Sequence, residues 1–255
     1  MTDRRFFVGV EDWSSDQIIV RGEQAYHLKS VLRARVGDCF EFVDGEGRWA
    51  RARVEAIPTR GEVICHIQEQ HTTRSPKEDR AVLIQALIRF EKFEWILEKA
   101  TELGTTRIIP VVTAHTEARW REVSRARRDR WQKILIESLK QCRRLHLPVL
   151  AEPEPFDQAV SRAKAEVKLI LSEKPGTPAL KSVFLAIRST FEGVRRNPAS
   201  PRISLAVGPE GGWTDEEIAF SLQCGFMPAS LGEGILRTET AALAGLAILG
   251  YELED

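Results

Sequence analysis

The sequence predicts an α/β protein: a mostly β-stranded domain over residues 1–73, followed by a parallel α/β domain over residues 74–255. Three observations lead to this prediction. Within the first 70 residues, apolar and polar side chains alternate in short segments, as they do in strands. Residues 70–79 are polar and lack apolar periodicity, which is typical of a linker. After them, short apolar segments alternate with helical ones, which favours a parallel sheet.

The first domain contains a hairpin signal. Residues 38–43 and 49–54 both alternate, and the sequence Asp-Gly-Glu-Gly between them is suited to a turn. In the second strand, Trp49, Arg51 and Arg53 share one face. An aromatic ring beside two guanidinium groups can stack on RNA bases and pair with phosphates. A solvent-facing strand with one partly covered tryptophan explains the pattern equally well.

Five short apolar segments are predicted to be the strands of the second domain: residues 81–88, 107–112, 167–172, 202–207 and 226–231. Helical spacing of apolar residues predicts a helix at each of four places: residues 26–36, 92–103, 124–143 and 241–249. The last of these helices is apolar nearly all round, so we expect it to be covered on every side, by the core or by a second copy of the chain.

We expect three of these helices to bury a defined set of side chains. The first buries Leu28, Val31 and Leu32 and turns Lys29, Arg33 and Arg35 outward. In the second, one stripe contains Phe93, Ile96, Leu97, Ala100 and Leu103. The third buries Trp131, Leu135, Leu139 and Cys142 and turns its arginines to the other side.

Composition limits the classes of function. The chain has 43% hydrophobic and 29% charged residues, as globular proteins do. No apolar run approaches the ~18 residues of a membrane span, and the N-terminus lacks the apolar segment of a signal peptide, so we expect a cytoplasmic protein. The four cysteines and five histidines show no metal-ligand spacing. We therefore expect no metal site and four reduced, mostly buried thiols.

Positive charge is concentrated in one segment, although the net charge is zero. Residues 119–144 contain 10 basic and 3 acidic side chains, and arginine outnumbers lysine 27 to 10 in the whole chain. Arginine suits bidentate contacts to phosphate. A GC-rich coding sequence would also raise the arginine content. Two interpretations of this segment therefore remain equally open: a phosphate-binding face and the solvated flank of a helix.

Two glycine-rich turns each follow a predicted strand near the C-terminus. The first is Gly208–Thr214, which runs into a helix through a capping box formed by Thr214 and Glu217. The second is the segment Ser230–Thr240. Glycines let a backbone approach a ligand closely, and ligands of open α/β sheets bind at the carboxyl ends of strands. The two turns therefore predict a ligand site, the alternative being two tight strand–helix connections.

The chain resembles the ribosomal RNA small-subunit methyltransferase E family of the SPOUT superfamily. The segments that carry the resemblance are GPEGGWTDEE, SLGEGILRTETA, FEWILEKATELG, HLKSVLRARVGD, RWQKILIESLKQCRR and the early RFF, in consistent order from Arg5 to about Leu249. The resemblance implies a PUA-like β-barrel domain for RNA and a parallel α/β domain with a trefoil knot. It also implies bound S-adenosylmethionine, a homodimer, and methylation at N3 of a uridine in small-subunit (16S) ribosomal RNA or the 30S subunit.

The resemblance also assigns candidate residues. The cofactor would be held by Leu171, Ser172, Glu173, Gly208, Pro209, Glu210, Gly211, Gly212, Ser230, Leu231, Gly232, Ile235 and Leu236. Basic and aromatic side chains expected to contact RNA are Arg5, Arg33, Trp49, Arg51, Arg53, Arg143 and Arg144. Two places depart from the family pattern. Gly234 stands where the family usually has arginine. Residues 114–117 differ from the serine-containing segment that the family pattern leads us to expect. We expect neither departure to touch the first glycine turn.

Methylation at N3 requires that the N3 proton is lost as the new bond forms. An arginine can stabilise the forming anion and a carboxylate can accept the proton. The candidates are Arg237, Glu239 and Glu210, although either glutamate can equally be pairing locally at a helix end. Two other functions remain open: a non-catalytic RNA-binding assembly factor with the same fold, which Gly234 favours, and a phosphate-binding enzyme that uses the first glycine turn as an anion nest.

Overall fold

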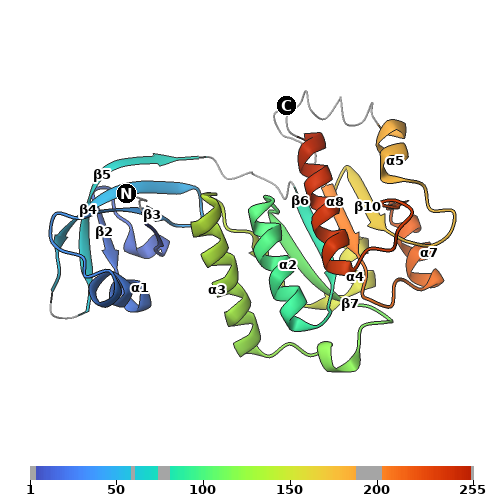
Figure 1. The fold of residues 1–255 in the computed structure, drawn as a ribbon, viewed down its shortest axis with the longest axis horizontal. Helices are drawn as coiled ribbons and strands as arrows, with labels where there is room; N and C mark the ends of the chain where they lie inside the picture. The colour runs from blue at the N-terminus through green and yellow to red at the C-terminus, as the bar shows by residue number, and fades with distance from the viewer. Residues whose placement is uncertain (1–3, 59–60, 74–80, 188–202, 254–255) are drawn as a thin grey trace. The chain divides into compact units, whose positions relative to one another are not determined.

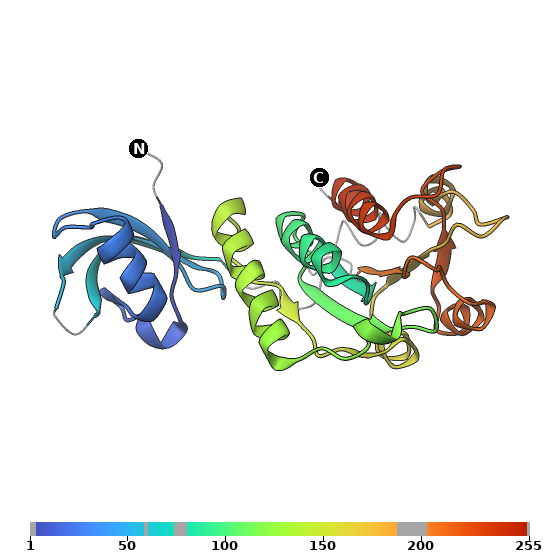
Figure 2. The same ribbon diagram turned by 60° about the horizontal axis from the view of Figure 1, so that its bottom comes forward.

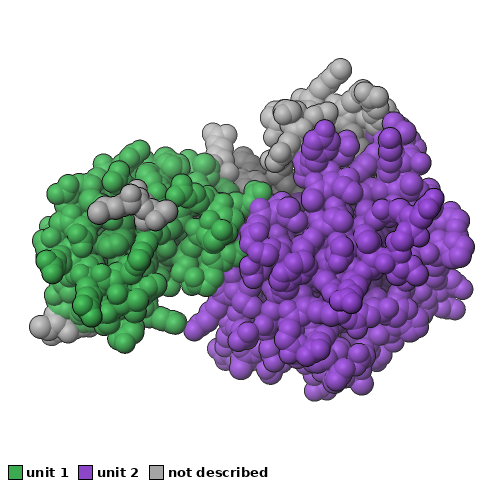
Figure 3. Space-filling view, in the orientation of Figure 1, with its two compact units in different colours: residues 1–75, 136–147 green, residues 76–135, 148–255 purple. Residues whose placement is uncertain are grey.

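The computed structural model describes residues 4–58, 61–73, 81–187 and 203–253. They form two compact units (Figure 3). Residues 1–75 with 136–147 make up the first, and residues 76–135 with 148–255 make up the second. Residues 136–147 therefore belong with the N-terminal unit, whereas the sequence assigned them to the second domain. The reason is backbone pairing: Gly45 and Gly47 of a turn hydrogen-bond with Leu147 and Leu145 at 2.8 and 3.0 Å.

The first unit is built on a five-stranded sheet in the order β1-β3-β4-β5-β2 (Figure 1). Its strands are β1 Arg5–Phe7, β2 Gln17–Val20, β3 Cys39–Val43, β4 Arg48–Ala56 and β5 Val63–Thr72. β1 runs parallel to β3, and the other pairs are antiparallel. The predicted hairpin is confirmed as β3 and β4, and on β4 Ala50, Ala52 and Val54 are buried.

The short helix of this unit differs from its prediction. It consists of α1, Gly22–Tyr26, continued by the π-helical turn His27–Val31. It ends early because Arg33 adopts a left-handed backbone, with φ of +52°. Leu28 is buried as expected, but Val31 is 61% exposed, so the inward position assigned to Val31 was wrong.

The expected linker is also shorter than predicted. Its first residues, 70–72, extend β5, because they pair with the backbone of β4 as far as Arg48 opposite Thr72. Residues 74–79 of the expected linker lie outside the described part of the chain.

The second unit is built on a seven-stranded sheet in which every pairing is parallel, in the order β12-β10-β11-β6-β7-β8, with β9 beside β7. The strands are β6 Ala81–Ala86, β7 Arg107–Val112, β8 Val149–Leu150, β9 Glu154–Pro155, β10 Val167–Leu171, β11 Ile203–Val207 and β12 Met227–Ala229. All five predicted strands of this domain are confirmed to within a few residues at each end.

The helices of this unit are α2 Phe90–Glu102, α4 Phe156–Arg162, α5 Leu180–Ala186, α7 Asp215–Gln223 and α8 Thr238–Leu253, and α3 Arg125–Cys142 begins in it. α2 and α8 pack together, as do α4 and α7. Figure 2 shows the first pair and the second pair on opposite faces of the sheet. Gly245 lets α8 approach β11 closely, because a Cβ there would lie 2.9 Å from Cδ2 of Leu205.

The predicted apolar stripes of α2 and α3 are confirmed with two exceptions. The expected side chains are buried, except that Leu103 follows the end of α2 and is 36% exposed, and Cys142 is only partly covered. On α8, the described residues cover one side, and cover of the other side by a second copy stays a prediction. Ala242, Leu246 and Leu249 are buried, whereas Ile248 and Tyr251 are 38% and 79% exposed. Among the described residues, nothing covers that outer face.

The remaining expectations from composition concern cysteines, membranes and metals. All four cysteines are free, but Cys65 alone is buried and the other three are partly exposed, so the expectation of mostly buried thiols was wrong. Within the described ranges, no helix has the length and apolar character needed to cross a membrane. Among the same residues, no cluster of side chains is suited to a metal ion.

Candidate functional site

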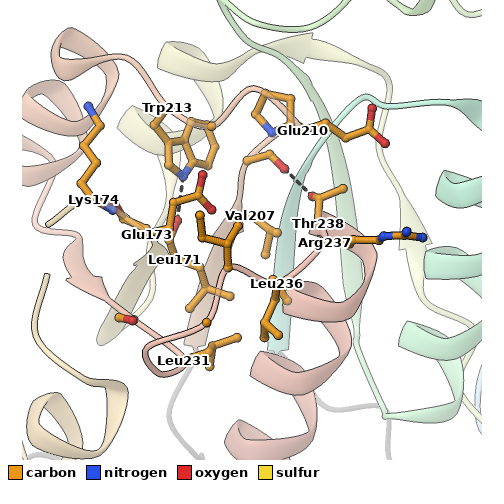
Figure 4. A pocket seen from close by; sticks show the side chains of 18 of the residues that line it. Leu171, Glu173, Lys174, Val207, Glu210, Trp213, Leu231, Leu236, Arg237 and Thr238 are labelled. Atoms are coloured by element: carbon orange, nitrogen blue, oxygen red, sulfur yellow. Dashed lines mark hydrogen bonds between the residues drawn. The ribbon is translucent and has the colours of Figure 1, made fainter.

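The two glycine turns meet at one cavity of about 670 Å³ (Figure 4). It lies where the chain leaves the carboxyl ends of β10, β11 and β12, because neighbouring parallel strands end at the same edge of a sheet. All thirteen residues that the sequence assigned to the cofactor line it. Arg237 and Thr238 at the start of α8 complete the wall, and Lys92 of α2 also lines it.

The first turn is held in place by Trp213. The indole of this buried residue donates a hydrogen bond of 2.8 Å to the Leu171 carbonyl oxygen and packs against Phe156 at 4.5 Å between ring centroids. A Cβ at Gly208 would lie 3.0 Å from the same indole, so the strand end and the ring are in contact at this glycine. The contact couples the ends of β10 and β11 on either side of the cavity.

Gly212 completes the turn with φ of +69°, a conformation that side-chain-bearing residues rarely adopt. A Cβ there would also lie 3.3 Å from Oε1 of Glu173. The predicted capping box is confirmed. Thr214 accepts a hydrogen bond from the Glu217 backbone at 3.1 Å, and the Glu217 carboxylate accepts one from the Thr214 backbone at 2.9 Å.

The second turn folds through its own backbone and joins the first through α8. Ser230 accepts a hydrogen bond from the Gly232 amide at 3.2 Å and donates one to its carbonyl oxygen at 2.8 Å. At the start of α8, the Thr238 hydroxyl donates to the Gly208 carbonyl oxygen. Buried Gln85 of β6 donates to the same hydroxyl at 3.4 Å. Both turns therefore form one hydrogen-bonded structure.

Lys92 connects two of the candidate catalytic residues, and sequence reasoning missed it. Its ammonium pairs with Glu210 and lies 3.6 Å from Glu239. The hydrogen bond to Glu210 is the main cause that raises the pKa of Lys92, and the charge of Glu239 adds to it. Oε2 of Glu239 is buried without a hydrogen-bond partner among the described residues. The guanidinium of Arg237 extends away from the apolar wall at Leu231 (Figure 4).

Residues 114–117 contact the first glycine turn, so the expectation that this departure from the family pattern leaves the turn untouched was wrong. Nδ1 of His115 lies 3.0 Å from the Gly212 carbonyl oxygen. The Ala114 amide donates to the Glu217 carboxylate at 2.8 Å. Parallel strand order explains this contact: the loops after β7 and β11 leave the same edge of the sheet, one strand apart.

The side chains expected to contact RNA lie in the first unit, and they differ in their exposure and in the partners that they already have. Trp49 stacks on His71 at 4.9 Å between ring centroids, and exposed Arg51 lies opposite Glu41 and Glu69 on the neighbouring strands. Exposed Arg53 shares their face. Arg5 pairs with Glu41 at 2.9 Å and its side chain is only 10% exposed, which leaves it little surface for a ligand. Arg33, Arg143 and Arg144 are exposed.

Several arginines of the basic segment are paired with carboxylates. Arg127 and Arg130 both bind the carboxylate of buried Glu94 on α2, at 2.9 and 2.8 Å. Burial raises the pKa of Glu94, but the hydrogen bonds from the two guanidinium groups outweigh this and hold it below its ordinary value. Arg128 pairs with Glu152. Arg127 and Arg130 therefore stabilise the packing of α3 on α2, and all three ion pairs reduce the charge available for phosphate.

Comparison with known proteins identifies the family. The model of an RNA methyltransferase domain matches residues 75–250, and that of an RNA methyltransferase PUA domain matches residues 20–68. The ribosomal RNA small subunit methyltransferase E of Synechocystis sp. is 33% identical over 98% of this chain and 78% of its own length. The chain belongs to the ribosomal RNA small subunit methyltransferase E family. The family member from Bacillus subtilis is 27% identical over 92% of this chain and 90% of its own.

Solved structures agree with this assignment. The family member from Neisseria gonorrhoeae, bound to S-adenosylmethionine, has a TM-score of 0.80 and 29% identity over 98% of this chain and 97% of its own. A putative methyltransferase from Legionella pneumophila, also with the cofactor bound, has a TM-score of 0.80 and 28% identity over 98% of both chains. The predicted fold class, a SPOUT-type parallel α/β domain after a PUA-like β domain, is confirmed. The trefoil knot stays an expectation from the resemblance.

Proposed function

We propose that this protein is an S-adenosylmethionine-dependent methyltransferase that acts on N3 of a uridine in small-subunit (16S) ribosomal RNA. The observation that carries the proposal is the single cavity formed by both glycine turns and the end of β10. Family relatives named for small-subunit ribosomal RNA, and two similar structures with the cofactor bound, support it.

The residues present fit this cofactor. A volume of about 670 Å³ falls within the range of small-molecule sites. Leu171, Leu231 and Leu236 offer apolar side chains to an adenosine, and the glycine turns offer backbone amides. Gly212 keeps free the space that a side chain would fill. Glu173 adds a carboxylate on the same wall, which suits a ligand that carries positive charge.

The cofactor, when bound, supplies an electrophilic methyl group on a sulfonium. The chain must hold the uridine in line with that group, and such positioning contributes up to roughly 7–11 kcal/mol in favourable cases. We assign stabilisation of the forming uridine anion to Arg237, which lies at the cavity and has no carboxylate partner among the described residues. We assign Glu210 and Glu239 to holding Lys92, and through it the junction of the two turns.

We further propose that the N-terminal unit binds the RNA. The face of β4 with Trp49, Arg51 and Arg53 offers an aromatic ring and two exposed guanidinium groups. Glu41 and Glu69 offset part of this charge, so the affinity has to include other basic residues. Exposed Arg33 and Arg143 are candidates for that role, whereas Arg5 is engaged by Glu41.

A homodimer in the cytoplasm completes the proposal. The outer face of α8 exposes Ile248 and Tyr251, and the neighbouring second turn exposes Ile235 by 79%. On α2, which packs against α8, Trp95 is 43% exposed. Apolar residues gathered on adjacent elements are typical of an interface, and the same face on a second copy would cover them.

One observation favours the alternative of a non-catalytic RNA-binding assembly factor. Gly234 lies in the second turn where the family usually has arginine, and no atom lies within 4 Å of where its Cβ would be, so the position faces open space. The experiment that separates the two is calorimetric titration with S-adenosylmethionine followed by transfer of a labelled methyl group to unmethylated 30S subunits. Transfer located at N3 of one uridine supports the enzyme, and cofactor binding without transfer supports the assembly factor.

A further inference from the structure

An exposed histidine contacts the first glycine turn, in the segment that departs from the family pattern. His115 follows β7, and its Nδ1 is 3.0 Å from the Gly212 carbonyl oxygen. A Cβ at Gly211 would lie 3.0 Å from the His115 Cβ. Both glycines line the cavity. The imidazole is therefore fixed against the turn that would hold the cofactor.

This contact determines which ring nitrogen is free. A carbonyl oxygen only accepts hydrogen bonds, so Nδ1 of His115 must be the donor. In the neutral ring the lone pair then lies on Nε2, which has no hydrogen-bond partner among the described residues. A histidine held through Nδ1 with Nε2 open is the arrangement of an oriented general base.

The carboxylates that the sequence suggested as proton acceptors are engaged elsewhere. Glu210 and Glu239 share the ammonium of Lys92, so each carboxylate already has an ion-pair partner. The second oxygen of Glu239 is buried, so a substrate cannot reach it without rearrangement. General acid–base catalysis is most efficient when the acceptor titrates near the working pH, and imidazole is the side chain that does so.

We infer that His115 is the proton acceptor in methyl transfer. The lone pair of N3 forms the new bond to the methyl carbon. The bond from that carbon to sulfur breaks, and its electron pair stays on sulfur. The N3 proton passes to Nε2 of His115, and water later takes it from the imidazolium. This inference rests on the proposed function.

Charged groups from three elements surround the imidazole. The carboxylate of Glu217 on α7 accepts from the amide of Ala114. On the side of β10, Glu173 approaches Gly212. On the segment itself, Arg121 donates to the carbonyl oxygens of Ala114 and Thr116. Exposed Glu117 pairs with Arg119.

Two substitutions separate proton transfer from a structural role. His115→Asn places an amide N–H near the position of Nδ1, so it preserves a donor for the Gly212 carbonyl but removes Nε2. His115→Gln removes that donor instead. The matched control is His27→Gln, which changes an exposed histidine on the first unit. Each variant is titrated with S-adenosylmethionine and then assayed for single-turnover methyl transfer to 30S subunits between pH 5.5 and 9.

We expect His115→Asn to bind the cofactor within about twofold of the wild type and to transfer methyl groups at least about 100-fold more slowly, as loss of a general base does. The wild-type rate should rise with pH, because only an unprotonated Nε2 can accept the N3 proton, and His115→Asn should lose this rise. His27→Gln should match the wild type. Wild-type rates and an unchanged pH profile in His115→Asn would overturn the inference.

Two other outcomes distinguish a failure of this inference from a failure of the proposed function. If His115→Asn loses cofactor affinity, His115 shapes the turn rather than accepting a proton, and the inference is wrong. If the wild-type protein binds the cofactor but transfers nothing to 30S subunits, the proposed function fails before the role of His115 arises.

Discussion

Gly212→Val tests the assignment of the cavity most directly. The native residue has φ of +69°, and a Cβ there would lie 3.3 Å from Oε1 of Glu173. The left-handed backbone costs a side-chain-bearing residue roughly 1–2 kcal/mol, and more when it is β-branched. The two methyl groups of valine also extend beyond the Cβ, at a residue that lines the cavity. We expect affinity for S-adenosylmethionine to fall at least 100-fold, or about 2.8 kcal/mol.

The matched control is Gly225→Val. Gly225 has φ of +84° and follows the end of α7, but no atom lies within 4 Å of its would-be Cβ, and it does not line the cavity. The two variants should therefore lose similar stability, on the order of 1–3 kcal/mol. Only Gly212→Val should lose cofactor affinity.

The assay combines thermal denaturation with calorimetric titration of the cofactor for both variants and the wild type. Denaturation establishes that each variant is folded at the titration temperature. Unchanged cofactor affinity in folded Gly212→Val would refute the assignment of this turn. Equal loss of affinity in Gly225→Val would show that general strain, rather than filling of the cavity, weakens binding.

Three further predictions concern stability, assembly and RNA. The pKa of Glu94 is lowered, so its ion pairs stabilise the fold fully above its ordinary pKa, and this stability is lost as the pH falls through the folded-state value. Glu94→Gln should therefore lose about 1–3 kcal/mol at pH 7 and progressively less as the pH falls below the ordinary pKa of glutamate, measured by denaturation. Tyr251→Glu should shift the sedimenting mass from near twice 28.8 kDa towards 28.8 kDa, and a monomeric wild type would contradict the dimer. The double substitution Arg51→Ala with Arg53→Ala should weaken RNA binding without changing cofactor affinity. It should also reduce the dependence of RNA affinity on salt concentration by roughly one to two phosphate contacts. An unchanged salt dependence would show that this face of β4 does not bind the RNA.

Truncation is a poorer test of RNA binding than these substitutions. Deleting residues 1–73 would remove the strands and the turn that pair with residues 145–147. The end of α3 and the segment after it would lose their packing partner, so a loss of activity would have more than one cause.

Local chemistry made much of the fold predictable from the sequence. The capping box of Thr214 and Glu217 follows from side chains three residues apart, and the structure contains both of its hydrogen bonds. The glycine turn between β3 and β4 and the apolar strands of the second unit likewise depend on neighbours in the chain. The two glycine turns could be expected to meet because parallel strands end at one edge of a sheet.

Tertiary packing decided which side chains that are distant in the sequence meet, and the spacing of residues along the chain does not encode these contacts. Lys92 meets Glu210 across 118 positions and His115 meets the Gly212 carbonyl across 97, because α2 and the loop after β7 both reach the edge where β11 ends. Such partners depend on strand order, which the sequence pattern leaves open. The short helix of the first unit ends early at the left-handed Arg33. α8 has one open face because, among the described residues, its packing partners lie on one side. Local residues therefore determined the elements, and strand order and packing determined which side chains share the site.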